Sequence, residues 1–66
     1  MMNETRLNEI AKEYGCELVK ELKNRLGYVY EYSFKKNGQK IYAGYIGNND
    51  RYFLDESEIV AKIAEV

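Results

Sequence analysis

The sequence predicts an α+β fold in which a long N-terminal helix, an antiparallel meander and a short C-terminal helix follow one another. Three observations carry this prediction. Apolar residues recur at spacings of three and four near the N-terminus, residues alternate with period two around an Asn-Gly pair, and a helix-capping pattern precedes the last apolar stripe. A length of 66 residues allows one domain, residues 1–66, with both helices expected on one face of the sheet.

The first helix is expected over about residues 4–26. Its apolar stripe consists of Leu7, Ile10, Ala11, Tyr14, Leu18, Leu22 and Leu26. Asn3 or Thr5 can cap its start, and Gly27 stands where a C′ glycine ends a helix. Gly15 interrupts the stripe without changing its phase, at a cost of about 1 kcal/mol relative to alanine. One continuous helix is therefore favoured, and a break at Gly15 into two helices stays open.

A β-hairpin over residues 28–46 is the clearest local prediction. Asn37-Gly38 favours a type I′ turn, because both central residues of that turn need positive φ. The two-residue loop then fixes the register. The predicted cross-strand pairs are Phe34 with Ile41, Tyr32 with Ala43, and Tyr30 with Tyr45.

The two faces of this hairpin are expected to differ. The face predicted to be core carries Tyr28, Tyr30, Tyr32, Phe34, Ile41, Ala43 and Tyr45. The other face carries Val29, Glu31, Ser33, Lys35, Lys40, Tyr42, Gly44 and Ile46, and is charged near the turn and apolar near the base. Tyr42 is therefore the best candidate for an exposed aromatic ring.

Two further elements complete the chain. After a turn at residues 47–50, residues 51–54 predict a short third strand, which a marginally stable two-stranded ribbon needs. A last helix is expected over residues 56–65. Asp55 as N-cap and Glu58 three residues later match a capping box.

The composition argues against an enzyme. There is no histidine, and the single cysteine, Cys16, can form neither an internal disulfide nor a structural zinc site. We expect no catalytic residue, no metal, no cofactor and no small-molecule substrate. No stretch approaches the ~20 apolar residues of a membrane span, and a lone thiol favours a reducing, cytoplasmic setting. The lack of proline and the many Lys, Glu and Ile residues are typical of heat-adapted proteins.

Basic residues concentrate in the middle of the chain, although the net charge is −1. Lysines surround the predicted hairpin tip, where they can contact phosphates, and an aromatic ring on the same face can stack on a base. The residues expected to contact nucleic acid are Lys35, Lys36, Lys40, Tyr42, Lys20, Lys23 and Arg25. The alternatives are an ordinary mixed-charge surface and lysines that discourage edge-to-edge aggregation.

Two stretches of the chain resemble known families. The first stretch resembles the first helix and turn of a helix-turn-helix, and it reads Leu7-Asn8-Glu9-Ile10-Ala11-Lys12-Glu13-Tyr14-Gly15-Cys16. The hairpin that follows resembles the wing of winged-helix DNA-binding domains. Glu21 departs from that pattern, which has an apolar residue there. Residues 27–63 resemble small Tyr-rich hairpin–helix domains of uncharacterised archaeal and mobile-element proteins. The motifs that carry this resemblance are Gly-Tyr-Val-Tyr-Glu-Tyr, Lys-Asn-Gly-Gln-Lys and Tyr-Ile-Gly. The three-stranded DNA-binding domains of some phage-type integrases have a similar spacing of strands and turns. These resemblances imply association with DNA or RNA.

Two functions are therefore expected. The first is a small non-catalytic nucleic-acid-binding protein that uses its basic hairpin tip on DNA or RNA. The second is a protein-interaction or homodimerisation module, whose contact is the long helix or a patch of Val29, Tyr42 and Ile46. A homodimer is plausible because a core this small has no disulfide or metal to support it.

Overall fold

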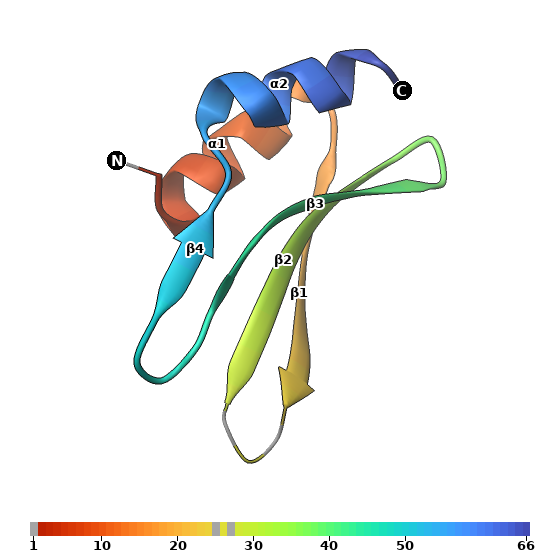
Figure 1. The fold of residues 1–66 in the computed structure, drawn as a ribbon. Helices are drawn as coiled ribbons and strands as arrows, with labels where there is room; N and C mark the ends of the chain where they lie inside the picture. The colour runs from red at the N-terminus through yellow and green to blue at the C-terminus, as the bar shows by residue number, and fades with distance from the viewer. Residues whose placement is uncertain (1, 25, 27) are drawn as a thin grey trace.

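The computed structural model describes residues 2–24, 26 and 28–66, and shows a four-stranded antiparallel sheet with two helices against one face (Figure 1). The elements in order are α1 (Glu4–Tyr14), β1 (Glu17–Asn24), β2 (Val29–Lys36), β3 (Gln39–Ile46), β4 (Arg51–Phe53) and α2 (Glu56–Ala64). The strands lie side by side in chain order, as a meander. The predicted α+β class, hairpin, short strand and C-terminal helix are confirmed.

The first helix is shorter than predicted. It begins after Asn3, whose side chain accepts a hydrogen bond from the Arg6 N–H at 2.9 Å, and ends at Tyr14. Gly15 follows in the left-handed conformation, with φ 67°, and donates its N–H to the Ala11 carbonyl. The predicted helix over residues 4–26 is therefore wrong beyond residue 14. Gly27, expected to end it, lies outside the described residues.

The segment after Gly15 is a strand, β1, and no second helix forms there. The sequence misled because a spacing of four residues is both a helical and a strand period: Leu18 and Leu22 share one face of either element. The second helix that the winged-helix resemblance implies is likewise replaced by β1. Leu18 packs against the core, and Leu22 is 46% exposed.

The hairpin has the predicted turn, and its register shifts farther from the tip. Asn37 and Gly38 both have positive φ, at 52° and 77°. The pairs that match the prediction include Phe34 with Ile41 and Lys35 with Lys40. Beyond Ser33, Tyr32 pairs with Gly44 and Tyr30 with Ile46, so the predicted pairs with Ala43 and Tyr45 are wrong.

Gly44 explains this shift, because it forms a β-bulge that inserts one extra residue into β3. Its φ is 148°, which side-chain-bearing residues rarely adopt, and a Cβ there would lie 2.8 Å from the Phe53 Cα. The bulge reverses the faces of the residues that follow. Tyr45, predicted in the core, turns to the side away from the helices, and Ile46 turns toward them.

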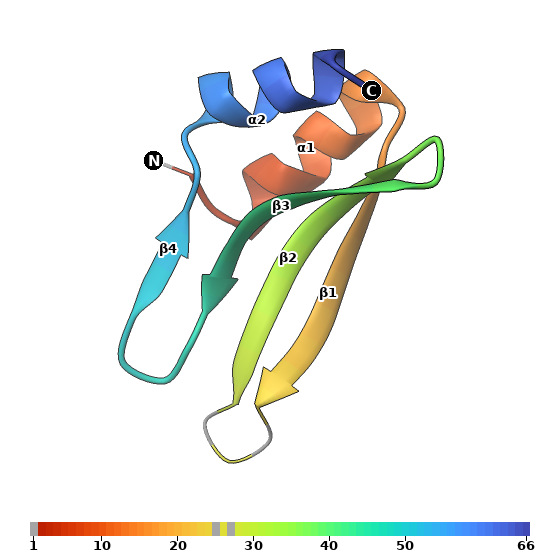
Figure 2. The ribbon, with the colours of Figure 1, turned by 45° about the vertical axis from the view of Figure 1, so that its right-hand side comes forward.

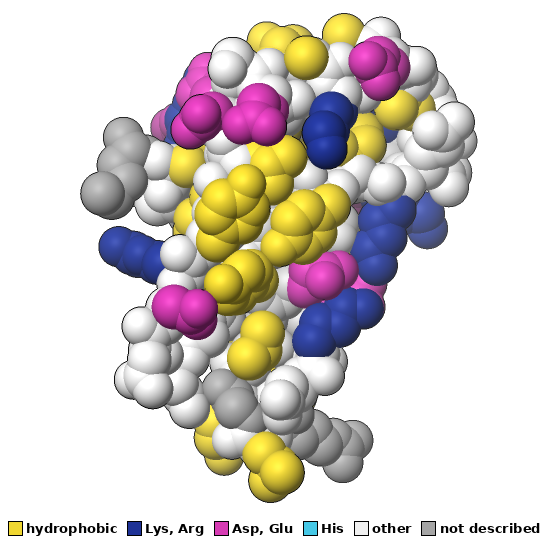
Figure 3. Space-filling model, in the orientation of Figure 1, with side chains coloured by type: hydrophobic (Ala, Val, Ile, Leu, Met, Phe, Trp, Pro, Cys, Tyr) yellow, Lys and Arg dark blue, Asp and Glu magenta, His cyan; other side chains and the backbone are white. Residues whose placement is uncertain are grey.

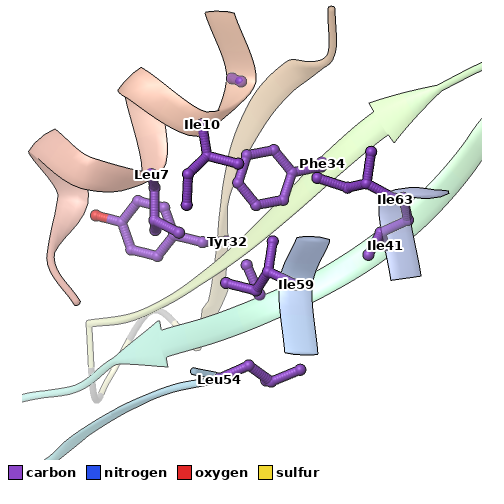
Figure 4. Close-up of a cluster of buried hydrophobic side chains, with 10 residues drawn as sticks. Leu7, Ile10, Tyr32, Phe34, Ile41, Leu54, Ile59 and Ile63 are labelled. Carbon is purple, nitrogen blue, oxygen red and sulfur yellow. The ribbon is translucent and has the colours of Figure 1, made fainter. Parts of the chain in front are cut away.

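The core fills the space between the helices and the covered face of the sheet (Figure 4). Its buried members are Leu7, Ile10, Ala11, Tyr32, Phe34, Ile41, Ala43, Leu54, Ile59 and Ile63. Tyr28, also predicted there, is instead 62% exposed. The helices are joined at the surface by Arg6, which donates two hydrogen bonds of 2.8 Å to the Glu56 carboxylate.

The last helix begins at the predicted place. Asp55 is its N-cap residue, with extended backbone, but its side chain makes no capping hydrogen bond, so the bond that the capping box predicts is missing. Ile59 and Ile63 anchor the helix in the core. Neither helix in the described part of the chain has the length and apolar character needed to cross a membrane.

Candidate binding surface on the open face of the sheet

The two faces of the sheet differ in what covers them. We call the face against α1 and α2 the inner face and the opposite one the outer face. The strand register places Glu17, Val19, Glu21, Val29, Glu31, Ser33, Lys35, Lys40, Tyr42, Tyr45 and Tyr52 on the outer face. Figure 3 shows hydrophobic side chains gathered across the middle of the molecule, with acidic and basic side chains beside them.

Three tyrosines form the centre of the outer face, and we call them the tyrosine triad: Tyr42, Tyr45 and Tyr52. Tyr42 is 38% exposed, as its position predicted, and Tyr52 is 51% exposed. The rings of Tyr45 and Tyr52 lie opposite each other on β3 and β4, with centroids 6.3 Å apart and planes tilted by 40°. The triad is thus a partly open aromatic surface.

The Gly44 bulge assembles the triad. Tyr42 and Tyr45 are three residues apart, so a regular strand would place them on opposite faces. The extra residue at the bulge brings both to the outer face, where β4 adds Tyr52. A glycine in the interior of a predicted strand is the sequence signal that could have found this bulge.

Two phenol groups of the triad, those of Tyr42 and Tyr45, have raised pKa values. Burial raises the pKa of Tyr42, with a smaller contribution from the nearby Glu31 carboxylate. The Tyr45 hydroxyl donates a hydrogen bond to Asp50 Oδ2 at 3.1 Å, and this bond raises the pKa of Tyr45. The Tyr45 hydroxyl hydrogen is therefore already committed to Asp50.

Glutamates neutralise part of the predicted basic surface. Lys40 Nζ lies 2.6 Å from Glu21 Oε1, and Lys23 Nζ lies 3.3 Å from Glu21 Oε2 and 3.9 Å from Glu31 Oε1. The hydrogen bonds from Lys40 and then Lys23 lower the pKa of Glu21. Two of the lysines predicted to contact nucleic acid are thus already in ion pairs with carboxylates.

Lys20 lies on the inner side of the sheet, away from the triad. Its ammonium is 4.7 Å from the centre of the Tyr30 ring, 5.6 Å from that of Tyr32 and 3.6 Å from Glu4 Oε2. The Tyr32 hydroxyl donates a hydrogen bond to the same Glu4 carboxylate. Lys20 therefore belongs to a cluster that joins α1 to the sheet. Arg25, the other predicted contact in this part of the chain, lies outside the described residues.

Lys35 and Lys36 are the lysines of the hairpin tip that keep their charge available. No ion pair joins either of them within the described part of the chain. Lys35 lies on the outer face and, with Lys40, Val19, Glu21 and Gly38, lines a shallow depression of about 340 Å³. The depression adjoins the triad, because Lys40 and Tyr42 are neighbours on the same face of β3. Lys36 is half-buried and points to the opposite side of β2.

The outer face therefore combines aromatic rings with the Lys35 ammonium, which has no ion-pair partner within the described part of the chain. Of the predicted contacts, the structure brings Lys35, Lys40 and Tyr42 together, and sequence reasoning missed Tyr45 and Tyr52. The predicted Val29, Tyr42 and Ile46 patch does not form, because Ile46 lies on the inner face. No cluster of three Cys, Asp or Glu side chains suited to a metal occurs among residues 2–24, 26 and 28–66. Comparisons with protein-family models, curated proteins and solved structures gave no match.

Proposed function

We propose that this chain is a small non-catalytic binding protein of the cytoplasm that holds single-stranded nucleic acid against the outer face of its sheet. The tyrosine triad stacks on bases, and Lys35 contacts a phosphate at the hairpin tip. The observation that carries the proposal is the gathering of three tyrosines on the sheet face opposite the two helices, where Tyr42 and Tyr52 are exposed.

Aromatic stacking supplies most of the binding energy in this proposal. Each base that stacks on an aromatic side chain contributes about 1–3 kcal/mol by alanine substitution, with little dependence on base identity. An antiparallel sheet presents such rings on neighbouring strands, as Tyr45 and Tyr52 are on β3 and β4. Single strands are the expected ligand, because their bases are unstacked and reach the rings.

Charge plays a smaller part than the sequence alone predicted. The net charge is −1, and Glu21 holds both Lys40 and Lys23. Each phosphate contact on a single strand contributes about −0.7 to the slope of log K against log salt. One unpaired lysine among the described residues of the outer face, Lys35, therefore predicts a slope of about −0.7, much shallower than that of a protein that binds mainly through phosphates.

Fluorescence anisotropy with a labelled oligothymidylate, measured at low salt, tests the proposal. Tyr52→Ala should weaken binding roughly 5- to 150-fold, because it removes one stacked ring, whereas Tyr52→Phe should keep most of the affinity. Tyr14→Ala is the matched control, since Tyr14 is 40% exposed on α1, away from the triad. No binding at low salt, or equal losses in Tyr52→Ala and Tyr14→Ala, would contradict the proposal.

A protein partner is the second candidate, and one observation favours it. The triad is surrounded by charges that neutralise one another, such as Lys40 with Glu21 and Lys23 with Glu31. An aromatic centre within a polar rim is the usual anatomy of a protein interface. This candidate predicts that neither duplex nor single-stranded oligonucleotides change the tyrosine fluorescence at low salt.

A further inference from the structure

One edge of the sheet is formed by β1. This strand spans eight residues and, within the described part of the chain, pairs only with β2. Figure 2 shows β1 along one margin of the sheet. The unpaired N–H and C=O groups of such an edge form a template for another strand. The other margin, β4, offers only three residues.

The side chains of β1 match a second copy of the same strand. We infer that two copies of this chain pair antiparallel along β1, about a two-fold axis at Lys20, and join their sheets into one. A two-fold axis normal to the sheet keeps both inner faces on the same side. Each residue then lies opposite a residue of the same face.

Centring the axis on Lys20 matches both faces of the strand. On the inner side, Leu18 of one copy lies opposite Leu22 of the other, which covers a leucine that is 46% exposed in the free chain. On the outer side, Glu17 lies opposite Lys23, and opposite charges at facing positions stabilise an antiparallel pair. The symmetry makes each of these pairs twice.

The neighbouring registers match the strand less well. An axis at Val19 sets Glu17 against Glu21 of the second copy, and like charges directly opposite destabilise the pairing. An axis at Glu21 sets Leu22 against Lys20 of the second copy, so that no two leucines face each other. The favoured register brings two Lys20 side chains together, but Glu4 Oε2 lies 3.6 Å from each ammonium and offsets its charge.

The small size of the chain favours the same assembly. At this length, apolar burial barely offsets the loss of chain entropy, and one cysteine supplies no internal disulfide. Pairing along β1 covers Leu22 and gives hydrogen-bond partners to backbone N–H and C=O groups at the edge of the sheet. The inference is independent of what the tyrosine triad binds, because the triad lies on β3 and β4.

Sedimentation equilibrium of the full chain over a wide concentration range tests the inference. The unmodified chain should show a monomer–dimer equilibrium. Lys23→Glu sets like charges against Glu17 at two places and should weaken the dimer about tenfold. The charge-swapped Glu17→Lys/Lys23→Glu should restore its stability to within about threefold. A monomer at every concentration, or a dimer that Lys23→Glu leaves unchanged, would overturn the inference; circular dichroism verifies that each variant is folded.

Disulfide trapping tests the register itself. In a Cys16→Ser background, the variants Lys20→Cys, Val19→Cys and Glu21→Cys each carry a single thiol. Only position 20 faces its own copy in the favoured register, with Cα atoms about 5 Å apart, within reach of a disulfide. Lys20→Cys should therefore form a covalent dimer fastest under mild oxidation. Faster trapping through Val19→Cys or Glu21→Cys would overturn the assignment of the axis to Lys20.

Discussion

The inner and outer faces of the sheet use the same kind of residue for different ends. On the inner face, Tyr32 and Phe34 are 2% and 0% exposed and pack beneath two helices. On the outer face, Tyr42 and Tyr52 keep a large part of their rings in solvent. The many tyrosines in this chain therefore do not all have the same role. Its meaning depends on which face each ring occupies, and a single bulge decides that for Tyr45.

The largest expected effect is a difference between the two faces in how much a substitution lowers the free energy of unfolding. Phe34→Ala removes a fully buried ring and should lower the free energy of unfolding by about 3–5 kcal/mol, much of the roughly 5–15 kcal/mol that native domains have in total. Tyr52→Ala, on the outer face, should change it far less, because half of that ring is exposed. Urea denaturation measures both, and equal losses would mean that the outer face is also core.

The next effect concerns the bulge that distinguishes the faces. Gly44→Ala introduces a Cβ that overlaps the backbone of β4 in a strained conformation, and should cost roughly 3 kcal/mol or more. Gly38→Ala is the matched control. Its φ is also positive, at 77°, but nothing lies within 4 Å of the added Cβ, so we expect a loss of only about 1 kcal/mol. Urea midpoints compare the two, and similar losses would show that close contact with β4 is unimportant.

The fold class, the turn and most of the covered face could be predicted from the sequence. The prediction was wrong in two places: after Gly15, where the apolar spacing fits both a helix and a strand, and beyond Ser33, where the extra residue of a bulge changes the strand register. The spacing of Leu18 and Leu22 fits a helix and a strand equally well, so only the pairing of this segment with β2 decides that it is a strand. The register of the hairpin followed correctly from Asn37-Gly38 as far as Ser33. Beyond it, the bulge depends on the contact of Gly44 with β4, which no local pattern contains.

The site was predicted in part for a similar reason. Tyr42 and Lys35 were placed correctly on the outer face, because they lie between the turn and the bulge. Tyr45 and Tyr52 were missed, because the bulge and the pairing of β4 bring them there. That Glu21 neutralises Lys40 could not be predicted either, because residue 21 was expected in a helix and not beside the hairpin.

A smaller effect is expected from acid. The hydrogen bond from Tyr32, and then the nearby Lys20 ammonium, lower the pKa of Glu4 in the folded chain from its ordinary value of 4.5. A lowered pKa means that the ionised carboxylate stabilises the fold above pH 4.5, and that this contribution is lost as pH falls through the folded value. Glu4→Gln should therefore be less stable than the unmodified chain at pH 7, with a difference that narrows at pH 3. Urea midpoints at both pH values measure it, and a constant difference would contradict this role of Glu4.

The smallest effect on stability is expected at the outer-face ion pairs. Glu21→Gln removes exposed contacts with Lys40 and Lys23, and exposed ion pairs contribute little to folding. The same change frees the Lys40 ammonium beside the triad, whereas Lys23 keeps its contact with Glu31. It should therefore raise the affinity for a single-stranded oligonucleotide severalfold and steepen its salt dependence by about 0.7 units of slope. Unchanged affinity, measured by anisotropy, would indicate that these lysines lie outside the bound strand.

The most direct test of the outer face as the binding surface is a backbone chemical-shift titration with a short oligothymidylate at low salt. The account predicts that the amide signals that move lie on β3 and β4 around Tyr42, Tyr45 and Tyr52, with smaller changes at Lys35 and Lys36. Signals from α1 and α2 should stay in place. Shifts confined to the helices, or no shifts at all, would contradict the account.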